Sequence, residues 1–483
     1  MLKKIALITF ILFFLYAALW AQEFGFGSFD EEDTSTSSLI PAVFVSGEVA
    51  AAIVGYLDEI VEGPEHIKTR DMFMFSGKLK FLAQSSLAQG VINLKLVPAL
   101  VPVSIDEAYI GAFYKGFDIS AGLKKVAWGK ADQFGPLDII NMPDQSKIFI
   151  EMADNTNLQD VKIAIPVIHA SYRFGMFSKI EGILLPSFEI TSMAVSSAVG
   201  KSNDYLALVT GPSSPERWMP VQMLKLSSIL QNRGSLITPD TSGLDYAQAG
   251  LRFTTTIVSA DIGIQYFYGR MFQPAAKTII NLADPSAPDF NPAAPYTIDV
   301  EFMFNKYHQI GIDYAQVLAG FNVRAEAAAN ITEDLDGDDA FVYNPSIGWS
   351  FGFDRDLFLG INLNCQANGS VRLMDDKIGS SKDPFTPSFN LNPDFDIEAD
   401  TSMTSTRLTA MLSKKFLRDE LELRAAVVWG IEDSDYAIIP SLIWARDGLR
   451  AALSGGFFLG DSEGQLGQYN SNNFIKASLS YTF

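Results

Sequence analysis

The residues of this sequence that could act on a solute are cations placed at alternate positions within apolar stretches. Lys78 and Lys80, for example, are separated by Leu79. Fixed positive charges on a water-filled wall attract anions, so this spacing predicts contact with anionic solutes. The alternative is that the cations pair with carboxylates of neighbouring strands and only stiffen the wall. The predicted solute contacts are Lys78, Lys80, Lys95, Lys124, Lys130, Arg252, Arg324, Arg407 and Arg424.

Acidic residues occupy the same polar faces, but basic residues outnumber them on the predicted strands. The formal net charge of the chain is −20, so most of the negative charge must lie in loops and in the N-terminal tail. This distribution predicts a lumen that favours anions behind an acidic outer surface. The further charged residues expected on these faces are Lys476, Asp118, Asp299, Glu301, Glu326 and Glu422.

The sequence contains no arrangement that is typical of an enzyme or of a metal centre. It has 3 histidines and a single cysteine, Cys365, which excludes an intramolecular disulfide. The acidic run 334–339 lacks the downstream bidentate glutamate of a calcium loop. We therefore predict no catalytic residues, no metal and no cofactor. A hydrolase whose serine, histidine and acid lie far apart in the sequence stays open.

The elements that must position these side chains are strands, because apolar residues recur at every second position. In the last nine residues, Ile475, Ala477, Leu479, Tyr481 and Phe483 alternate with polar or small residues. A strand with one apolar and one polar face suits a wall between lipid and water. The alternative is an edge strand of a soluble sandwich. A mean hydropathy of +0.14 is too low for a helical membrane bundle.

Candidate strands follow one another along the chain, and many have a length of about 10–14 residues, which suits tilted membrane strands. Short turns alternate with long loops, as they do when turns face the periplasm and loops the exterior. Both termini are periplasmic only if the strand number is even, so we treat 295–318 as one long strand that projects beyond the membrane. The predicted fold is all-β: a single transmembrane antiparallel β-barrel of about 18 strands, within a range of about 16–20. The candidate strands are 41–55, 71–83, 87–97, 104–115, 117–128, 159–173, 176–189, 246–257, 259–271, 295–318, 320–331, 340–353, 356–369, 402–415, 418–431, 435–446, 448–460 and 472–483.

The two ends of the chain carry signals of export and assembly. Residues 1–21 read as a signal peptide, with a basic start, an apolar middle and a small residue before the cut. Residues 22–40 are predicted to form a flexible periplasmic tail, and 41–483 the barrel. The final strand, with Leu479, Tyr481 and Phe483 at alternate positions, resembles the C-terminal assembly signal of bacterial outer-membrane barrels. The barrel-assembly machinery is therefore an expected partner.

The most distinctive internal stretch runs from Trp128 to Asp144 and opens a long loop. It resembles a family of bacterial outer-membrane barrels of uncharacterised function that share Trp-Gly-x-Ala-Asp followed by Asp-x-x-Asn-Pro-x-Asp. The first pattern matches in full, whereas Met142 interrupts the second. The resemblance implies a large barrel with a loop folded toward the lumen. The residues expected to structure that loop are Trp128, Gly129, Asp132, Asp138 and Asn141.

These observations predict an outer-membrane channel for passive diffusion of small, anionic solutes. One alternative is uptake of hydrophobic compounds, because the segment 215–231 has helical apolar spacing from Val221 onward and the fatty-acid channel family uses such a surface helix. Another is a structural or adhesion barrel with a closed lumen. Outer-membrane lipid and a small-molecule solute are the other expected partners, and the acidic net charge disfavours nucleic acid. The oligomeric state stays open.

Overall fold

A computed structural model gives the structure of the protein and describes most of the unit Pro41–Phe483. The described residues are 42–57, 72–97, 101–143, 148–154, 158–188, 236–272, 274–282, 286, 296–339, 341–374, 403–461 and 464–483. The predicted signal peptide, the N-terminal tail and the helical segment 215–231 lie outside these residues. Within them, no helix is both long enough and apolar enough to cross a membrane.

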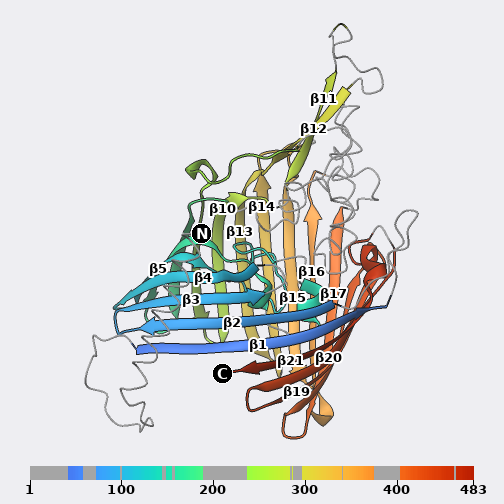
Figure 1. Cartoon of the computed structure of the whole chain (residues 1–483). Coiled ribbons are helices and arrows are strands. Elements are labelled where there is room, and N and C mark those ends of the chain that lie inside the picture. The colour runs from blue at the N-terminus through green and yellow to red at the C-terminus, as the bar shows by residue number, and fades with distance from the viewer. Residues whose placement is uncertain are drawn as a thin grey trace. The chain divides into compact units, whose positions relative to one another are not determined.

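The chain forms a closed antiparallel β-barrel of 18 strands, as the alternating pattern predicts (Figure 1). Each strand pairs with the next barrel strand along the chain, and β1 pairs with β21 to close the cylinder. The barrel strands are β1 (Ala42–Tyr56), β2 (Met72–Gln84), β3 (Ala88–Val97), β4 (Val101–Tyr114), β5 (Phe117–Lys124), β6 (Ile165–Phe174), β7 (Ser178–Leu185), β9 (Gln248–Ile257), β10 (Ala260–Arg270), β13 (Lys306–Leu318), β14 (Phe321–Thr332), β15 (Ser346–Asp356), β16 (Ile361–Arg372), β17 (Thr404–Phe416), β18 (Leu421–Gly430), β19 (Asp435–Arg446), β20 (Leu449–Leu459) and β21 (Phe474–Thr482). The described helices are α2 (Ile148–Met152), η1 (Leu158–Val161), η4 (Leu244–Tyr246), η5 (Phe358–Gly360) and η8 (Gly467–Asn472).

The seam between β1 and β21 extends to the last residue of the chain. Gly47 and Phe483 exchange two backbone hydrogen bonds of 2.9 Å. A Cβ atom on Gly47 would lie 2.6 Å from the Phe483 ring, so the close approach requires glycine. The side chains of Leu479, Tyr481 and Phe483 are about half exposed on the outward face. Their predicted role in assembly stays a prediction.

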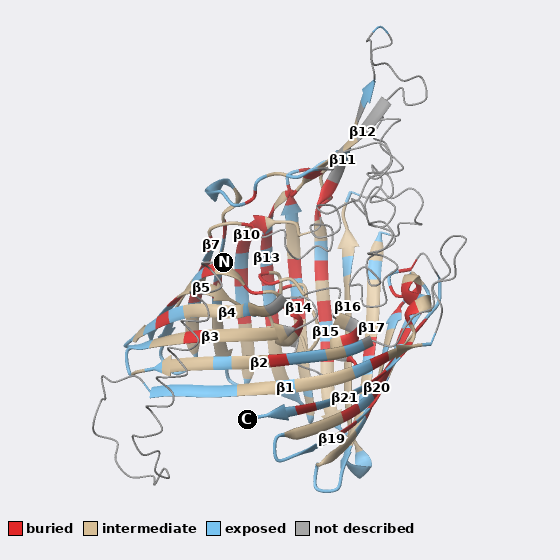
Figure 2. Ribbon diagram, viewed as in Figure 1, coloured by how far each residue is buried: buried red, intermediate tan, exposed pale blue. Residues whose placement is uncertain are grey.

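Buried and exposed residues alternate along the strands of the wall (Figure 2), and many exposed residues are apolar whereas many buried ones are polar, the reverse of a soluble protein. On β20, Leu453 points outward and is 53% exposed, whereas its neighbour Ser454 points inward and is 4% exposed. On β9, Leu251 is 53% exposed and Arg252 only 3%. An exposed apolar belt around buried polar groups requires lipid outside, which excludes the soluble sandwich.

Connections alternate in length, as the sequence predicts. At one end of the barrel the strands are joined by tight turns such as Lys115–Gly116 and Asp447–Gly448, whose φ angles are all positive. Consecutive positive φ angles are typical of the two-residue turns that match the twist of antiparallel strands. Most connections at the opposite end are much longer. We call these two ends of the barrel the turn end and the loop end.

The prediction of one long strand over 295–318 is wrong. The chain breaks at Phe304 and Asn305, which separate β12 (Tyr296–Met303) from barrel strand β13. Asn305 causes the break, because its side chain bonds the backbone of Phe341 and Tyr343 at 3.1 and 3.3 Å. β12 instead pairs with β11 (Ala275–Leu282) and β8 (Leu236–Ile237) in a separate sheet. Asp299 and Glu301 therefore lie outside the barrel wall, although the even strand number is correct.

Candidate functional site

The connection between β5 and β6, residues 125–164, lies inside the barrel and is described at 125–143, 148–154 and 158–164. We call it the crossing segment. Its first half contacts β14 through Asp132 and Arg324, which lie 2.5 Å apart. Its second half contacts β2 through Asp160 and Lys78, which lie 3.3 Å apart. Because β2 and β14 are separated by half the circuit of the wall, the segment spans the lumen.

The Trp-Gly-x-Ala-Asp motif wraps around a carboxylate of the wall. Glu326 on β14 accepts hydrogen bonds from the backbone N–H of Lys130 and, at 2.7 Å, from that of Ala131. Gly129 has φ +97°, and a Cβ there would lie 2.5 Å from a Glu326 carboxylate oxygen. A Cβ on Gly135 would collide with the same carboxylate. The glycines are therefore required for the backbone to enclose the Glu326 side chain.

Asp132, the last residue of that motif, bonds the crossing segment to neighbouring strands of the wall. Its carboxylate lies 2.5 Å from the Arg324 guanidinium and accepts a hydrogen bond of 2.9 Å from the Asn364 amide on β16. Arg324 also bonds Asp354 on β15 at 2.7 Å. One turn of the segment is thus bonded by β14 and β16, and Asp354 of β15 holds the Arg324 side chain between them. Gln366 on β16 adds a bond of 2.9 Å from the Gln133 N–H.

The part of the motif that follows is tied to the segment itself and to the end of β5. The Asp138 carboxylate lies 2.5 Å from the Lys162 ammonium, whose side chain is 1% exposed. Burial raises the pKa of Asp138 above its ordinary value, and the Lys162 charge acts in the opposite direction. The Asn141 side chain accepts from the Val126 N–H at 2.6 Å and donates to the Ile163 carbonyl at 2.8 Å. These bonds join the beginning and the end of the segment.

Trp128 fixes the start of the segment by packing rather than by hydrogen bonds. The indole is buried in a cluster with Phe267 and Tyr307, two inward residues of the wall. It fits over Gly250 on β9, where a Cβ would lie 2.6 Å from the ring. All five residues that the sequence assigns to loop structure thus make tertiary contacts, while β5 ends at Lys124 rather than at 128.

The second half of the segment is anchored by residues that the sequence did not single out as a site. Asp154 lies 3.1 Å from the Lys476 ammonium and accepts a bond of 2.7 Å from the Ser478 hydroxyl, both on β21. Lys476 also donates to the Ile150 carbonyl at 3.0 Å. Arg450 on β20 donates to the Asp154 carbonyl. The alternation in β21 marks Lys476 as inward, but its partner lies too far away in sequence for any spacing to reveal.

Five of the nine predicted solute-contact cations lie in ion pairs. Lys78 is 3.8 Å from Glu48 as well as 3.3 Å from Asp160. Lys95 is 2.6 Å from Asp106. The remaining paired cations are Lys130 with Asp261 at 3.9 Å, Arg252 with Asp313 at 2.5 Å, and Arg324 with Asp132 and Asp354.

The other four predicted cations are not in ion pairs within the described part of the chain. Lys124 bonds the Ser120 hydroxyl at 2.9 Å and lies over the Tyr109 ring. Arg407 donates to the Gln465 side chain. Arg424 donates to the Ser441 hydroxyl at 3.1 Å. Lys80 is exposed. Solute contact by any of the nine stays a prediction.

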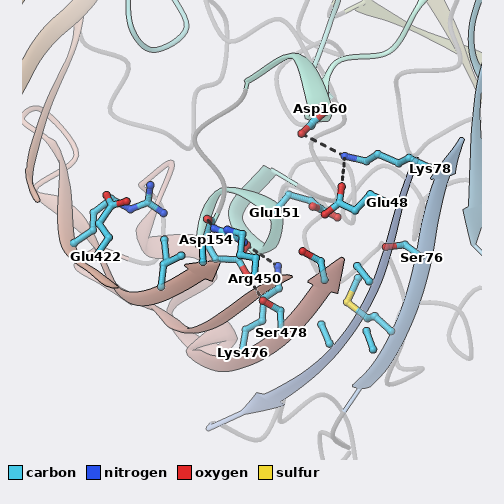
Figure 3. Close-up of a pocket in the computed structure, with 18 of the residues that line it drawn as sticks. Glu48, Ser76, Lys78, Glu151, Asp154, Asp160, Glu422, Arg450, Lys476 and Ser478 are labelled. Carbon is cyan, nitrogen blue, oxygen red and sulfur yellow. Dashed lines mark hydrogen bonds and ion pairs between the residues drawn. The ribbon is translucent and has the colours of Figure 1, made fainter. Parts of the chain in front are cut away.

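Two cavities adjoin the crossing segment. The turn-end cavity has a volume of about 490 Å³ and is lined by residues of β1, β2, β17 to β21, the turn between β17 and β18, and the crossing segment (Figure 3). Asp154, Lys476 and Arg450 lie along one side of it, whereas Glu48 and Lys78 lie on another. The loop-end cavity, of about 390 Å³, is lined by Phe134, Pro136 and side chains of β13 to β17. The segment thus borders a hollow at each end of the barrel.

Comparison with known proteins reveals no family. No family model matches the chain, and no curated protein matches it. Among solved structures, the chain is similar to Wzi of Escherichia coli, described as a carbohydrate-binding β-barrel involved in group 1 capsule assembly, at 10% identity over 90% of this chain and 84% of that one, with a TM-score of 0.43. It is also similar to the outer membrane channel DcaP of Acinetobacter baumannii, at 10% identity over 92% and 99% of the two chains, with a TM-score of 0.40. A third similar structure is OmpF of Salmonella typhi, at 8% identity over 91% of this chain and 97% of that one, with a TM-score of 0.39. TM-scores this low carry no weight for function.

Proposed function

We propose that the protein is an outer-membrane channel for passive diffusion of small polar solutes. The observation that carries the proposal is a closed barrel with an apolar exterior, a polar interior and a segment that spans the lumen. Such a wall is stable only where lipid meets its outer face. A segment held by ion pairs on opposite walls narrows the passage and limits the size of the solute.

The anionic preference predicted from the sequence has weak support. Ion pairs cancel the charge of Lys78, Lys95, Lys130, Arg252 and Arg324. The turn-end cavity is lined by seven carboxylates and five cations, so it carries no excess of positive charge. We therefore propose a channel with little overall preference between small anions and cations. Hydrophobic uptake rests on residues 215–231, which lie outside the described residues, and no observed contact favours it.

Conductance of the full-length protein in planar lipid bilayers tests this function. We expect stepwise increases in current, and a reversal potential close to zero in a salt gradient of potassium chloride. Swelling of liposomes in small sugars would give an independent measure of permeation. A protein that inserts into the bilayer and carries no current would instead be a closed structural barrel, and the channel proposal would be wrong.

A further inference from the structure

One cation that lines the turn-end cavity has a hydrogen-bond donor that no described residue satisfies. Arg424 on β18 is 7% exposed and lines the turn-end cavity. Its Nε donates to Ser441, but its buried Nη2 has no hydrogen-bond partner within the described residues. A buried charged donor without a partner is costly, so an acceptor that reaches the Arg424 guanidinium from the cavity would be stabilised. A carboxylate matches the planar guanidinium best.

A carboxylate lies two residues away on the same strand and the same face. Glu422 also lines the turn-end cavity, and its carboxylate has no hydrogen bond or ion pair in the described part of the chain. Alternate residues of a strand are separated by about 7 Å, so Glu422 and Arg424 present opposite charges side by side without contacting each other. Arg450 and Asp154 are the other charged groups that act on Arg424.

The charges around this pair select the kind of ligand. Asp419 from the turn between β17 and β18 and Lys415 opposite Glu422 on β17 line the same cavity, so its charges are mixed and give a multiply charged anion no uniformly positive surface. A ligand with one negative and one positive group would meet a complementary group at each end. The volume of about 490 Å³ falls within the range of small-molecule sites, about 300–1,000 Å³.

We propose that the turn-end cavity is a binding site for small amphoteric solutes of the amino-acid type. The ligand carboxylate bonds Arg424, and its ammonium bonds Glu422. The crossing segment contributes Glu151, Asp154 and Asp160 to the lining of the same cavity. This inference rests on the proposed channel function and adds to it the class of solute that the channel retains in transit.

The test measures the block of ion current through the full-length protein at pH 7 by three related probes. Glutamine carries both charges, N-acetylglutamine only the carboxylate, and glutaminamide only the ammonium. We expect glutamine to reduce the current at about one-tenth of the concentration that either capped probe requires. The Arg424→Gln variant should raise the half-blocking concentration of glutamine about tenfold and leave that of glutaminamide unchanged. The Glu422→Gln variant should raise the half-blocking concentration of glutaminamide and leave the half-blocking concentration of N-acetylglutamine unchanged.

A matched control removes a positive charge close to the cavity but outside it. Lys414 lies next to the cavity-lining Lys415 and packs over the Phe416 ring on the outward face, so Lys414→Gln should leave all three concentrations unchanged. The binding site would be ruled out if all three probes blocked the current equally, or if neither variant altered the block. The channel function would still stand, because the current itself supports it. If Arg424→Gln fails to insert, Glu422→Gln with glutaminamide decides the question. Absence of current in the wild type would overturn the channel function itself.

Discussion

The ammonium of Lys476 lies 3.1 Å from the carboxylate of Asp154, so a side chain of β21 holds one half of the crossing segment against the wall. Both side chains are 6% exposed. A buried ion pair of this kind contributes little when intact but costs a good deal when one partner is removed. The contact therefore couples the position of the segment to the stability of the barrel.

Replacing Asp154 should loosen the segment and widen the passage. The Asp154→Ala variant leaves Lys476 buried without a carboxylate, which should lower the free energy of unfolding by about 3 kcal/mol. Thermal unfolding in detergent measures this loss, and single-channel recording should show a larger conductance. Asp261→Ala removes a carboxylate that is half exposed and 3.9 Å from Lys130, and should change neither quantity appreciably. Equal conductance in wild type and Asp154→Ala would contradict the role of this anchor.

Removing the carboxylate that the motif encloses should release the other half of the segment. Glu326→Ala deprives the Lys130 and Ala131 N–H groups of their acceptor, so we expect a larger and noisier current. Glu326→Gln keeps one oxygen in place and should stay close to the wild type. Single-channel recordings of the two variants provide the comparison, and an indistinguishable pair would argue against the enclosure as the anchor.

The glycine of the motif should tolerate no side chain. Gly129→Ala introduces a Cβ at φ +97° and 2.5 Å from Glu326, and should cost about 1–3 kcal/mol of unfolding free energy. Gly90→Ala serves as the control, because nothing lies within 4 Å of a Cβ at that position. Thermal melts of the two purified variants measure the difference. Similar melting temperatures would show that the segment can shift to accommodate the methyl group.

Acid should loosen the loop between β18 and β19. Burial alone would raise the pKa of Glu432, but bonds from the Thr406 N–H and from the Thr404 and Thr406 hydroxyls outweigh it and hold that pKa below its ordinary value of 4.5. A lowered carboxyl pKa stabilises the folded state above the unfolded value, and this stabilisation is lost as the pH falls through the folded value. The protection of the 404–408 peptide against hydrogen exchange, taken relative to the intrinsic exchange rate at each pH, should therefore fall below about pH 4. The Glu432→Gln variant should show no such change with pH.

The sequence predicts the wall of this barrel well and its interior poorly. The wall follows from alternation within each strand, whereas the interior depends on contacts between residues far apart in the sequence. Alternation along one strand determines which side of β20 bears Leu453 and which bears Ser454. The same rule places Lys476 inward correctly. It cannot find Asp154, which is 322 residues away and is brought near only when β21 closes the barrel. The break at Asn305 is missed for a similar reason, because its cause is two contacts with a loop after β14.

The candidate site shows the same division. The motif residues Trp128 to Asn141 are recognisable in the sequence because their pattern resembles one shared by a family of outer-membrane barrels. Their partner Glu326 is recognisable only as an inward carboxylate, with nothing to indicate that it is enclosed by backbone N–H groups. The excess of cations on the predicted strands can be counted from the sequence, but their partners cannot. The ion pairs that neutralise five of the nine predicted cations depend on side-chain geometry across strands, which composition does not contain.

The pairing of Gly47 with Phe483 affects the rates at which the barrel folds and unfolds. These residues lie near opposite ends of the sequence, so the contact closes a very long loop. Closing such a loop costs conformational entropy, and we therefore expect this contact to form late in folding. Until that moment both terminal strands present unsatisfied backbone edges, which invite aggregation. Afterwards the cylinder offers no free edge from which strands could peel, and unfolding must begin by breaking an interior ladder. We therefore expect slow folding and even slower unfolding, so the barrel should be kinetically stable.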